Sequence, residues 1–324
     1  VISKNAVTEY VPLQMNEDVI TTQFPMGTLE ELGLLKMDFL GLRTLTVIRD
    51  TLELIRQKGE EAPDMDNISY DDPEVYRMIS RGETYGVFQL ESGGMTQCFK
   101  ELKPNSLEDI IAGISLYRPG AMDQIPLYIR NKNNPEKIKY MHPALEHILN
   151  VTYGCIIYQE QVMQIVRDLG GYSMGRSDLV RRAMGKKKAD VMAKERDNFI
   201  NGIVDENGKV IVAGCVRNGI SKETAANIFD EVAKFAGYGF NKSHAAAYAI
   251  IAYQTAWLKY YYPVEFSAAL ITSVMGNSKK VAEYIQHCKN KGIEVLPPDI
   301  NESSVSFTVK ENKIRFGLAA VKNV

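Results

Sequence analysis

Several patterns that would place this protein in a specialised class are missing from its sequence. Cysteine is scarce: the 324 residues contain four, Cys98, Cys155, Cys215 and Cys288, and no two of them are close in sequence. Zinc knuckles and redox motifs need cysteines only a few residues apart, so the spacing excludes both kinds of site and predicts reduced thiols. No apolar run approaches the ~20 residues that span a bilayer, and no charged-then-apolar leader opens the sequence. We therefore expect a cytoplasmic protein.

The sequence also lacks an excess of charge of either sign. Its 38 lysines and arginines oppose 40 acidic residues, which gives a formal net charge of −2. Domains that bind nucleic acid are often basic overall, so any such surface must be local here. Apolar residues make up 45% and charged residues 24%, as in an ordinary globular protein. A chain of 324 residues exceeds what one core usually serves, so two or three structural units are expected.

The first unit is expected to span residues 1–57, ahead of a polar break at 59–63. Residues 2–10 are expected to form a strand that is entered midway, and with the opening valine this favours an internal piece of a longer protein. A second strand is expected over residues 34–39, where the period-2 rule places Lys36 and Asp38 on one face. A helix is expected to follow over residues 42–57.

The largest unit, residues 58–275, is expected to be mostly helical, and a small α/β tail is expected over 276–324. Helices are predicted over 177–184, 189–202, 221–236, 244–261 and 278–290. Ser243 is expected to cap the helix before Pro263, which ends it. Strand-like segments lie at 86–90, 154–158, 306–309 and 314–317. The predicted fold class is α+β, predominantly helical.

A short basic stretch is the first candidate site. Residues 181–188 contain five basic side chains and no acid, and they lie at a predicted helix end followed by Gly185. Arg181 and Arg182 can make forked contacts with phosphate oxygens. Lys186, Lys187 and Lys188 would act as mobile point charges. The alternative is a solvated basic surface.

A second candidate is the glycine-hinged loop 237–244, which leads into a helix N-terminus. Backbone donors at such an end favour anions. Tyr238 or Phe240 could stack on a base, and Lys242 and His244 could meet a triphosphate. The loop is not a P-loop, because the lysine lacks the preceding glycine at the required spacing. The alternative is a helix–helix turn whose aromatic side chains pack into the core.

Four further residues carry weaker signals. Asp38 at a strand end could hold a divalent metal and Lys36 could offset phosphate charge, although one carboxylate cannot assemble a two-metal site. The alternative for Asp38 is a surface or helix-capping role. Arg118 lies at a rigid turn before Pro119, and Gln159 opens a predicted helix from which polar side chains can touch a strand.

Taken together, these segments resemble the bacterial DNA polymerase III alpha-subunit family, the C-family replicative polymerases. The resemblance covers essentially the whole chain, and several long motifs in one order are more specific than any one of them. The matching stretches are residues 33–45, 87–92, 117–120, 152–154, 158–163, 179–188, 235–244 and 296–301.

The resemblance implies a domain assignment and residue roles. Residues 1–57 would be the C-terminal part of a palm of the polymerase-beta type, 58–275 the fingers, and 276–324 the little finger, the start of the region that contacts duplex DNA and the sliding clamp. Asp38 would be the third metal-binding aspartate and Lys36 a neighbouring catalytic lysine. The implied nucleotide-binding residues are Arg181, Arg182, Lys186, Tyr238, Lys242 and His244, and the implied DNA-binding residues are Arg118, Gln159, Lys187 and Lys188.

The resemblance also implies an activity and partners. The parent enzyme would extend a primer by template-directed nucleotidyl transfer from a dNTP, with two Mg²⁺ ions, one of whose protein ligands is present here. Its partners would be primer–template DNA, the sliding clamp and other replisome subunits, in a bacterial cytoplasm at the nucleoid. The remaining palm aspartates and the helix-hairpin-helix module are expected outside this chain, so the piece should not polymerise alone. The alternatives are a non-catalytic nucleic-acid-binding module and an NTPase of another class, against which the missing P-loop counts.

Overall fold

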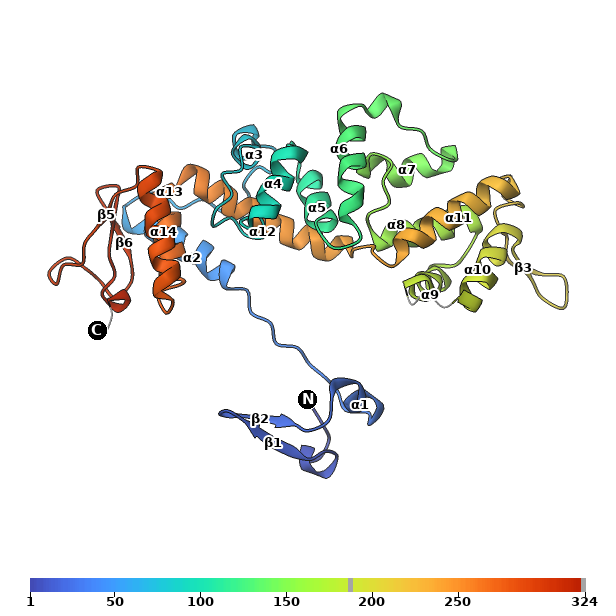
Figure 1. Cartoon of the computed structure of the whole chain (residues 1–324), viewed down its shortest axis with the longest axis horizontal. Coiled ribbons are helices and arrows are strands. Elements are labelled where there is room, and N and C mark those ends of the chain that lie inside the picture. Colours follow the sequence, from blue (N-terminus) through green and yellow to red (C-terminus); the bar gives the residue numbers. More distant parts are fainter. Residues whose placement is uncertain (186–188, 322–324) are drawn as a thin grey trace. The chain divides into compact units, whose positions relative to one another are not determined.

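The computed structural model describes residues 1–185 and 189–321. The chain divides into two compact units, residues 1–43 and 44–324, and each is described by itself. Helices dominate the described residues, which also contain three small sheets, so the predicted α+β, mainly helical fold class is confirmed (Figure 1). Among these residues no helix combines the length and the apolar character needed to cross a membrane.

The first unit is a hairpin with one short helix. Strand β1 (Leu13–Asn16) pairs antiparallel with β2 (Val19–Thr22), and α1 (Met26–Glu31) follows. A small apolar cluster of Val11, Leu29 and Leu34 holds these elements together.

Both strand predictions for this unit are wrong. Ile2 and Leu35 form a single antiparallel bridge, residues 7–9 form a 3₁₀ turn, and residues 36–42 adopt no regular structure. An alternating pattern yields a strand only where a neighbour satisfies its backbone hydrogen bonds, and here the two segments pair at one position alone.

The first core of the second unit is built around helix α12 (Lys242–Tyr261). This helix packs against α3 (Pro73–Ser80), α5 (Leu107–Leu116) and α13 (Pro263–Thr272), and Figure 1 shows it running beneath α3, α4 (Gly93–Leu102) and α5. Small residues at helical spacing make this close packing possible. They are the fully buried Ala245, Ala249, Ala252 and Ala256.

A second core lies among the helices between α5 and α12 in sequence. It joins α8 (Gln159–Gly170), α9 (Met174–Gly185), α10 (Ala189–Asn201) and α11 (Lys222–Ala236). The same core includes α7 (Glu146–Leu149) and the hairpin of β3 (Ile203–Val204) and β4 (Val210–Val212), whereas the buried residues of α6 (Ile125–Asn133) join the core around α12. Short 3₁₀ turns span Met122–Gln124, Pro135–Lys137, Pro143–Leu145 and Asn150–Thr152.

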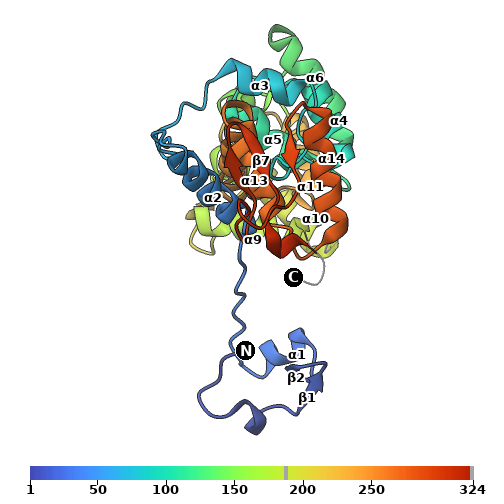
Figure 2. The same cartoon turned by 90° about the vertical axis from the view of Figure 1, so that its left-hand side faces the viewer.

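A third core gathers α2 (Arg43–Gln57), α13, α14 (Ser278–Asn290) and a three-stranded sheet. The sheet has the order β5 (Val295–Leu296), β7 (Lys313–Arg315), β6 (Thr308–Lys310), with β7 parallel to β5 and antiparallel to β6, and a 3₁₀ turn at Leu318–Ala320 follows it. Figure 2 faces this end of the second unit and shows α13 and α14 with β7 in front.

Helix positions were predicted well and their caps less well. The helices expected over 42–57, 189–202, 221–236 and 278–290 are confirmed as α2, α10, α11 and α14. Helix α9 begins at Met174, ahead of the expected start. The cap of α12 is Asn241 and not Ser243, because the Asn241 side chain accepts from the His244 N–H at 2.8 Å.

The strand-like segment 86–90 is a series of turns. Val87 and Leu90 are fully buried, and Gly86 has a φ of +77°, which an extended strand does not allow. In segment 154–158 only Tyr158 forms a β-bridge, with Phe240. The apolar side chains that suggested strands in both places are buried in segments without regular strand pairing.

Candidate functional site

The loop 237–244 is fixed to the start of α8 by backbone hydrogen bonds. The Phe240 N–H donates to the Ile157 carbonyl at 3.0 Å, and the Gln159 N–H donates to the Phe240 carbonyl at 2.9 Å. The Gln159 side chain donates to the Gly239 carbonyl at 3.0 Å. Because two segments far apart in sequence share these bonds, the loop has a defined position beside α8.

A single amide holds the start of α8 in turn. The Gln161 side chain is buried, and its Oε1 accepts from the N–H groups of Ile157 and Tyr158 at 2.9 and 3.0 Å. Its Nε2 donates to the Ile148 carbonyl and to the Thr152 hydroxyl. Gln161 therefore satisfies the backbone against which the loop pairs. The sequence predicts polar side chains at this helix start that can touch a strand, but it does not single out Gln161.

Arg118 joins the loop through its aromatic residues. The guanidinium carbon of Arg118 lies 4.0 Å from the centre of the Phe240 ring, within the range of a cation–π contact. His244 meets the edge of the same ring with centroids 5.4 Å apart, and lies 4.2 Å from the ring of Tyr248. The Phe240 ring therefore packs against side chains of the protein itself.

Tyr238 lies across the turn that carries Arg118. A Cβ built at Gly120 would overlap the Tyr238 ring, and Gly120 has a φ of +86°. Only glycine combines this conformation with so close an approach. The Tyr238 side chain remains partly exposed, so one part of its ring faces solvent while another packs on the turn.

Two carboxylates meet the start of α12, and sequence analysis missed both. Glu160 accepts from the Lys242 N–H with both oxygens, at 3.1 and 3.0 Å, and from the Asn241 side chain at 3.0 Å. Glu108 pairs with the Lys242 ammonium at 3.1 Å. An acid at a helix N-terminus is favourable, so Glu160 occupies the position where an anion was expected. Glu160 adjoins Gln159 in sequence, whereas no local pattern marks Glu108.

Arg181 and Arg182 share one partner on their own helix. The Asp178 carboxylate lies 2.8 Å from Arg181 Nη2 and 2.8 Å from Arg182 Nε. The hydrogen bond from Arg181 is the main reason that the pKa of Asp178 lies below its usual value. The Arg182 side chain is 65% exposed, that of Arg181 19%. Lys186, Lys187 and Lys188 lie outside the described residues.

Lys36 and Asp38 belong to the first unit and pair with each other, with 3.2 Å between Nζ and Oδ2. The Asp38 side chain is 60% exposed. Its oxygen donors suit a hard cation such as Mg²⁺. Within residues 1–185 and 189–321, however, no three His, Cys, Asp or Glu side chains are grouped to hold a metal.

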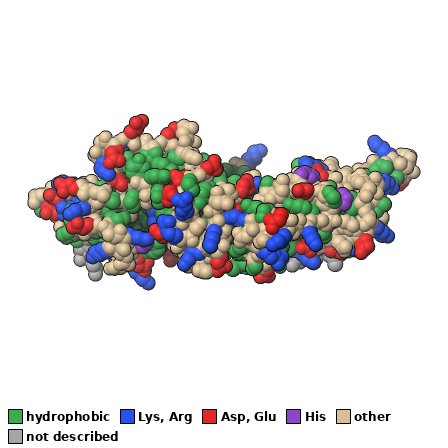
Figure 3. Space-filling model, turned by 90° about the horizontal axis from the view of Figure 1, so that it is seen from above, with side chains coloured by type: hydrophobic (Ala, Val, Ile, Leu, Met, Phe, Trp, Pro, Cys, Tyr) green, Lys and Arg blue, Asp and Glu red, His purple; other side chains and the backbone are tan. Residues whose placement is uncertain are grey.

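The face shown in Figure 3 carries basic and acidic side chains that are interspersed, and no field of one sign dominates it. On that face, an anion would therefore be bound by local arrangements of a few residues.

Comparisons with known proteins cover the whole chain. Residues 44–207 match the family model of the bacterial DNA polymerase III alpha subunit finger domain, and residues 1–41 that of the bacterial DNA polymerase III alpha NTPase domain. Residues 292–324 match a helix-hairpin-helix motif, which sequence analysis placed outside the chain.

Curated relatives agree with the family models. DNA polymerase III subunit alpha of Thermus aquaticus is 48% identical over 330 residues, and its namesakes in Bacillus subtilis and Pseudomonas aeruginosa are 45% and 44% identical. Each alignment covers 100% of this chain but only 26–28% of the relative's length. The match of the finger-domain model to half of the chain, together with these identities, shows that the chain belongs to the bacterial DNA polymerase III alpha-subunit family.

Proposed function

We propose that this chain is the nucleotide-handling part of a DNA-directed DNA polymerase that extends a primer by template-directed nucleotidyl transfer from dNTPs. The observation that carries the proposal is the finger-domain match over residues 44–207, which include Arg181 and Arg182 on one helix. Primer–template DNA and dNTPs are the proposed substrates. The sliding clamp and other replisome subunits are the proposed partners of the parent protein.

In this proposal Arg181 and Arg182 hold the incoming triphosphate. Both guanidinium groups now pair with Asp178, so each can exchange that carboxylate for phosphate oxygens of similar hydrogen-bonding geometry. A triphosphate carries more charge than one carboxylate, which favours the exchange. Lys186 would add a further positive charge.

The loop supplies the remaining contacts to the nucleotide. Tyr238 is partly exposed and can stack on a base. Lys242 and His244 would face the phosphates, and Lys242 would then have to leave Glu108. The salt bridge to Glu108 is therefore a competitor for the triphosphate.

Arg118 and Gln159 are proposed to position the DNA, together with Lys187 and Lys188. A guanidinium that stacks on a ring keeps its N–H groups in its own plane, where they can donate to phosphate. The guanidinium carbon of Arg118 lies 4.0 Å from the centre of the Phe240 ring, close enough for such stacking. Gln159 holds the loop through Gly239 and would act on DNA through the loop position.

Asp38 is proposed as one protein ligand of two Mg²⁺ ions, with Lys36 beside it. The other ligands would come from the part of the relatives' length that this chain does not span. When bound, such ions activate the primer hydroxyl and neutralise charge on the leaving pyrophosphate. In this chain Lys36 would release Asp38 and turn its ammonium to the nucleotide phosphates.

The role of Arg181 is tested by steady-state primer extension with the full-length protein. Arg181→Ala is expected to raise the apparent KM for dNTP by about tenfold or more, since a charge-assisted hydrogen bond contributes ~1.5–3 kcal/mol. Arg167→Ala is the matched control, because Arg167 also pairs with a neighbouring aspartate, Asp168, on a surface helix. An unchanged KM and turnover in Arg181→Ala would remove Arg181 from the proposal.

A second candidate function is a non-catalytic nucleic-acid-binding module, which the helix-hairpin-helix match over residues 292–324 favours. Such a module would bind DNA with a strong salt dependence and show no response to dNTP. Binding of primer–template DNA by the full-length protein, followed in the presence and absence of dNTP, distinguishes the two. Extension of the primer rejects this alternative.

A further inference from the structure

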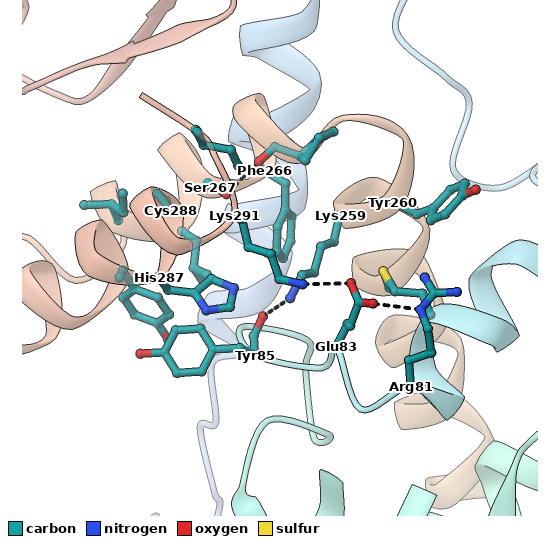
Figure 4. A pocket seen from close by; sticks show the side chains of 16 residues that line it. Arg81, Glu83, Tyr85, Lys259, Tyr260, Phe266, Ser267, His287, Cys288 and Lys291 are labelled. Atoms are coloured by element: carbon teal, nitrogen blue, oxygen red, sulfur yellow. Dashed lines mark hydrogen bonds and ion pairs between the residues drawn. The ribbon is translucent and has the colours of Figure 1, made fainter. Parts of the chain in front are cut away.

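A cavity of about 240 Å³ lies in the second unit, where α13 and α14 meet the turn that follows α3. None of the candidate site residues within the described ranges lines it. Figure 4 shows its lining, with Lys259 from the end of α12 and Lys291 from the segment after α14 reaching into the same space beside Glu83 and Tyr85. The cavity is therefore a separate feature that the proposed polymerase function does not use.

The cavity holds more positive than negative charge. Three cations line it, Arg81, Lys259 and Lys291, against one carboxylate, Glu83. Glu83 uses one oxygen on Arg81 at 2.7 Å and the other on Lys291 at 3.0 Å. Packing defects in a core are apolar, so a cavity that gathers cations differs from a mere gap between helices.

Within the part of the chain that the structure describes, Lys259 has no ion-pair partner of its own. Its ammonium donates to the backbone carbonyl of Tyr85 at 2.6 Å, and the two acids whose charge reaches it are Glu83 and Glu91. Glu83 is committed to Arg81 and Lys291, and Glu91 accepts from the Tyr284 hydroxyl at 3.3 Å. An ammonium has three N–H donors, so Lys259 has capacity for an added acceptor.

The rest of the lining is apolar and aromatic. Phe266 and Ile271 of α13 are buried beside the partly buried Leu270. Elsewhere in the lining, the rings of Tyr85 and His287 stack with centroids 4.4 Å apart. A flat apolar body fits between such walls, whereas a bare inorganic ion would leave them in contact with water.

The protonation behaviour of the two basic groups agrees with this picture. Burial lowers the pKa of Lys259 to about 8. Burial, with help from Lys259 and Lys291, lowers the pKa of His287 to about 4. Positive charge is thus costly here, and an anion in the cavity would offset that cost.

We infer that the cavity is a binding site for a small molecule with a flat apolar body and one anionic head, a carboxylate or a phosphate. The head pairs with Lys259 and Lys291, and the body lies between Phe266 and Leu270 on one side and the Tyr85–His287 stack on the other.

Calorimetric titration of the full-length protein tests this site with three probes of the same ring. The probes are 2-naphthoate, 2-naphthyl phosphate and the neutral 2-naphthamide. Binding of at least one anion about tenfold or more tighter than the amide is expected, since a hydrogen bond to a charged group has that effect. The two anions identify which head the site prefers. Equal binding of all three probes, or no binding of either anion, overturns the proposal.

Variants assign the binding to this cavity. Lys259→Met is expected to weaken binding of the preferred anion about tenfold or more. Lys291→Met changes a lysine whose side chain is 45% exposed, so this variant should fold. It allows the proposal to be tested even if Lys259→Met does not fold. Lys289→Met, an exposed lysine near the end of α14, is the matched control and should bind as the unchanged protein does. Retained affinity in the folded Lys259 or Lys291 variants places the probe elsewhere and overturns the proposal.

Discussion

At the scale of single residues, fully satisfied polar side chains set the geometry of the candidate site. Gln161 is the clearest case, because one buried amide makes four hydrogen bonds to the segments around Ile148 and Tyr158. A replacement side chain would need both a donor and an acceptor to make the same bonds. The defined position of the loop 237–244 follows from this residue as much as from the loop itself.

Replacement of Gln161 by leucine therefore should destabilise the protein. Two backbone N–H groups and the Ile148 carbonyl would lose their partner, at a cost of about 1–3 kcal/mol for each group left unsatisfied. Chemical denaturation should show a lower free energy of unfolding. Gln286→Leu, an exposed glutamine on α14, is the control. Equal stability of the two variants would contradict the importance of this amide.

His287 makes the stability depend on pH. Its pKa is about 4 in the folded protein, because burial and then the nearby lysines disfavour its charged form, whereas the ordinary value is 6.5. The unfolded chain thus binds the proton more readily, and stability is lost as the pH falls from about 6.5 towards 4. His287→Phe keeps a ring against Tyr85 and should lose less stability over this interval. Parallel pH profiles from denaturation of the two proteins would refute this.

At the scale of elements, helix α12 depends on the absence of large side chains along one face. Its four buried alanines include Ala249, which is fully inaccessible at the packed side of the helix. Well-packed cores have no room for added methylene groups without movement of the backbone or of neighbouring side chains. The alanine pattern thus sets how closely α5 can approach α12.

Ala249→Leu should cost about 1–3 kcal/mol of stability, as is typical for overpacking of a core. Ala247→Leu is the matched control, because the same change on the exposed side of the same helix adds no crowding. Thermal unfolding of both variants measures the difference. A Tm that falls equally in both would show that the buried face is not tightly packed.

Local signals predicted the helices, and non-local contacts explain most of the errors. The helix start at Ser221 and the break at Pro263 could be read from the sequence, because both signals act within one helical turn. The strand predicted over 34–39 failed because its pairing partner is a single residue, Ile2. In the site, Glu108 could not be predicted, because its pairing with Lys242 joins residues far apart in sequence.

At the scale of the whole molecule, the chain spans about a quarter of the length of its curated relatives, for example 26% for the Thermus aquaticus protein. Among the described residues no group of three metal-binding side chains occurs. The proposed polymerase chemistry is therefore tested in the parent protein.

In that parent protein, Asp38→Asn should reduce primer extension by more than about a hundredfold, because even outer-shell changes at metal sites cost 10–100-fold. DNA affinity should remain similar, since one exposed carboxylate does not attract a polyanion. Asp18→Asn, an exposed acid in the hairpin of the same unit, is the control. Extension rates and DNA affinities of the two variants are measured in parallel. Normal extension by Asp38→Asn would exclude Asp38 as a metal ligand.

The carboxylate of Glu160 at the start of α12 has one more consequence. A tethered group competes with free ligands at an effective concentration on the order of millimolar, without the entropy cost of capture from solution. We therefore expect Glu160 to compete with dilute phosphate and other simple anions for the Lys242 N–H, to which it is already bonded. A ligand that gains contacts elsewhere at the same time would displace it more readily. In the proposed nucleotide site, the start of α12 would then select ligands by the number of contacts they make simultaneously, and charge alone would not be enough.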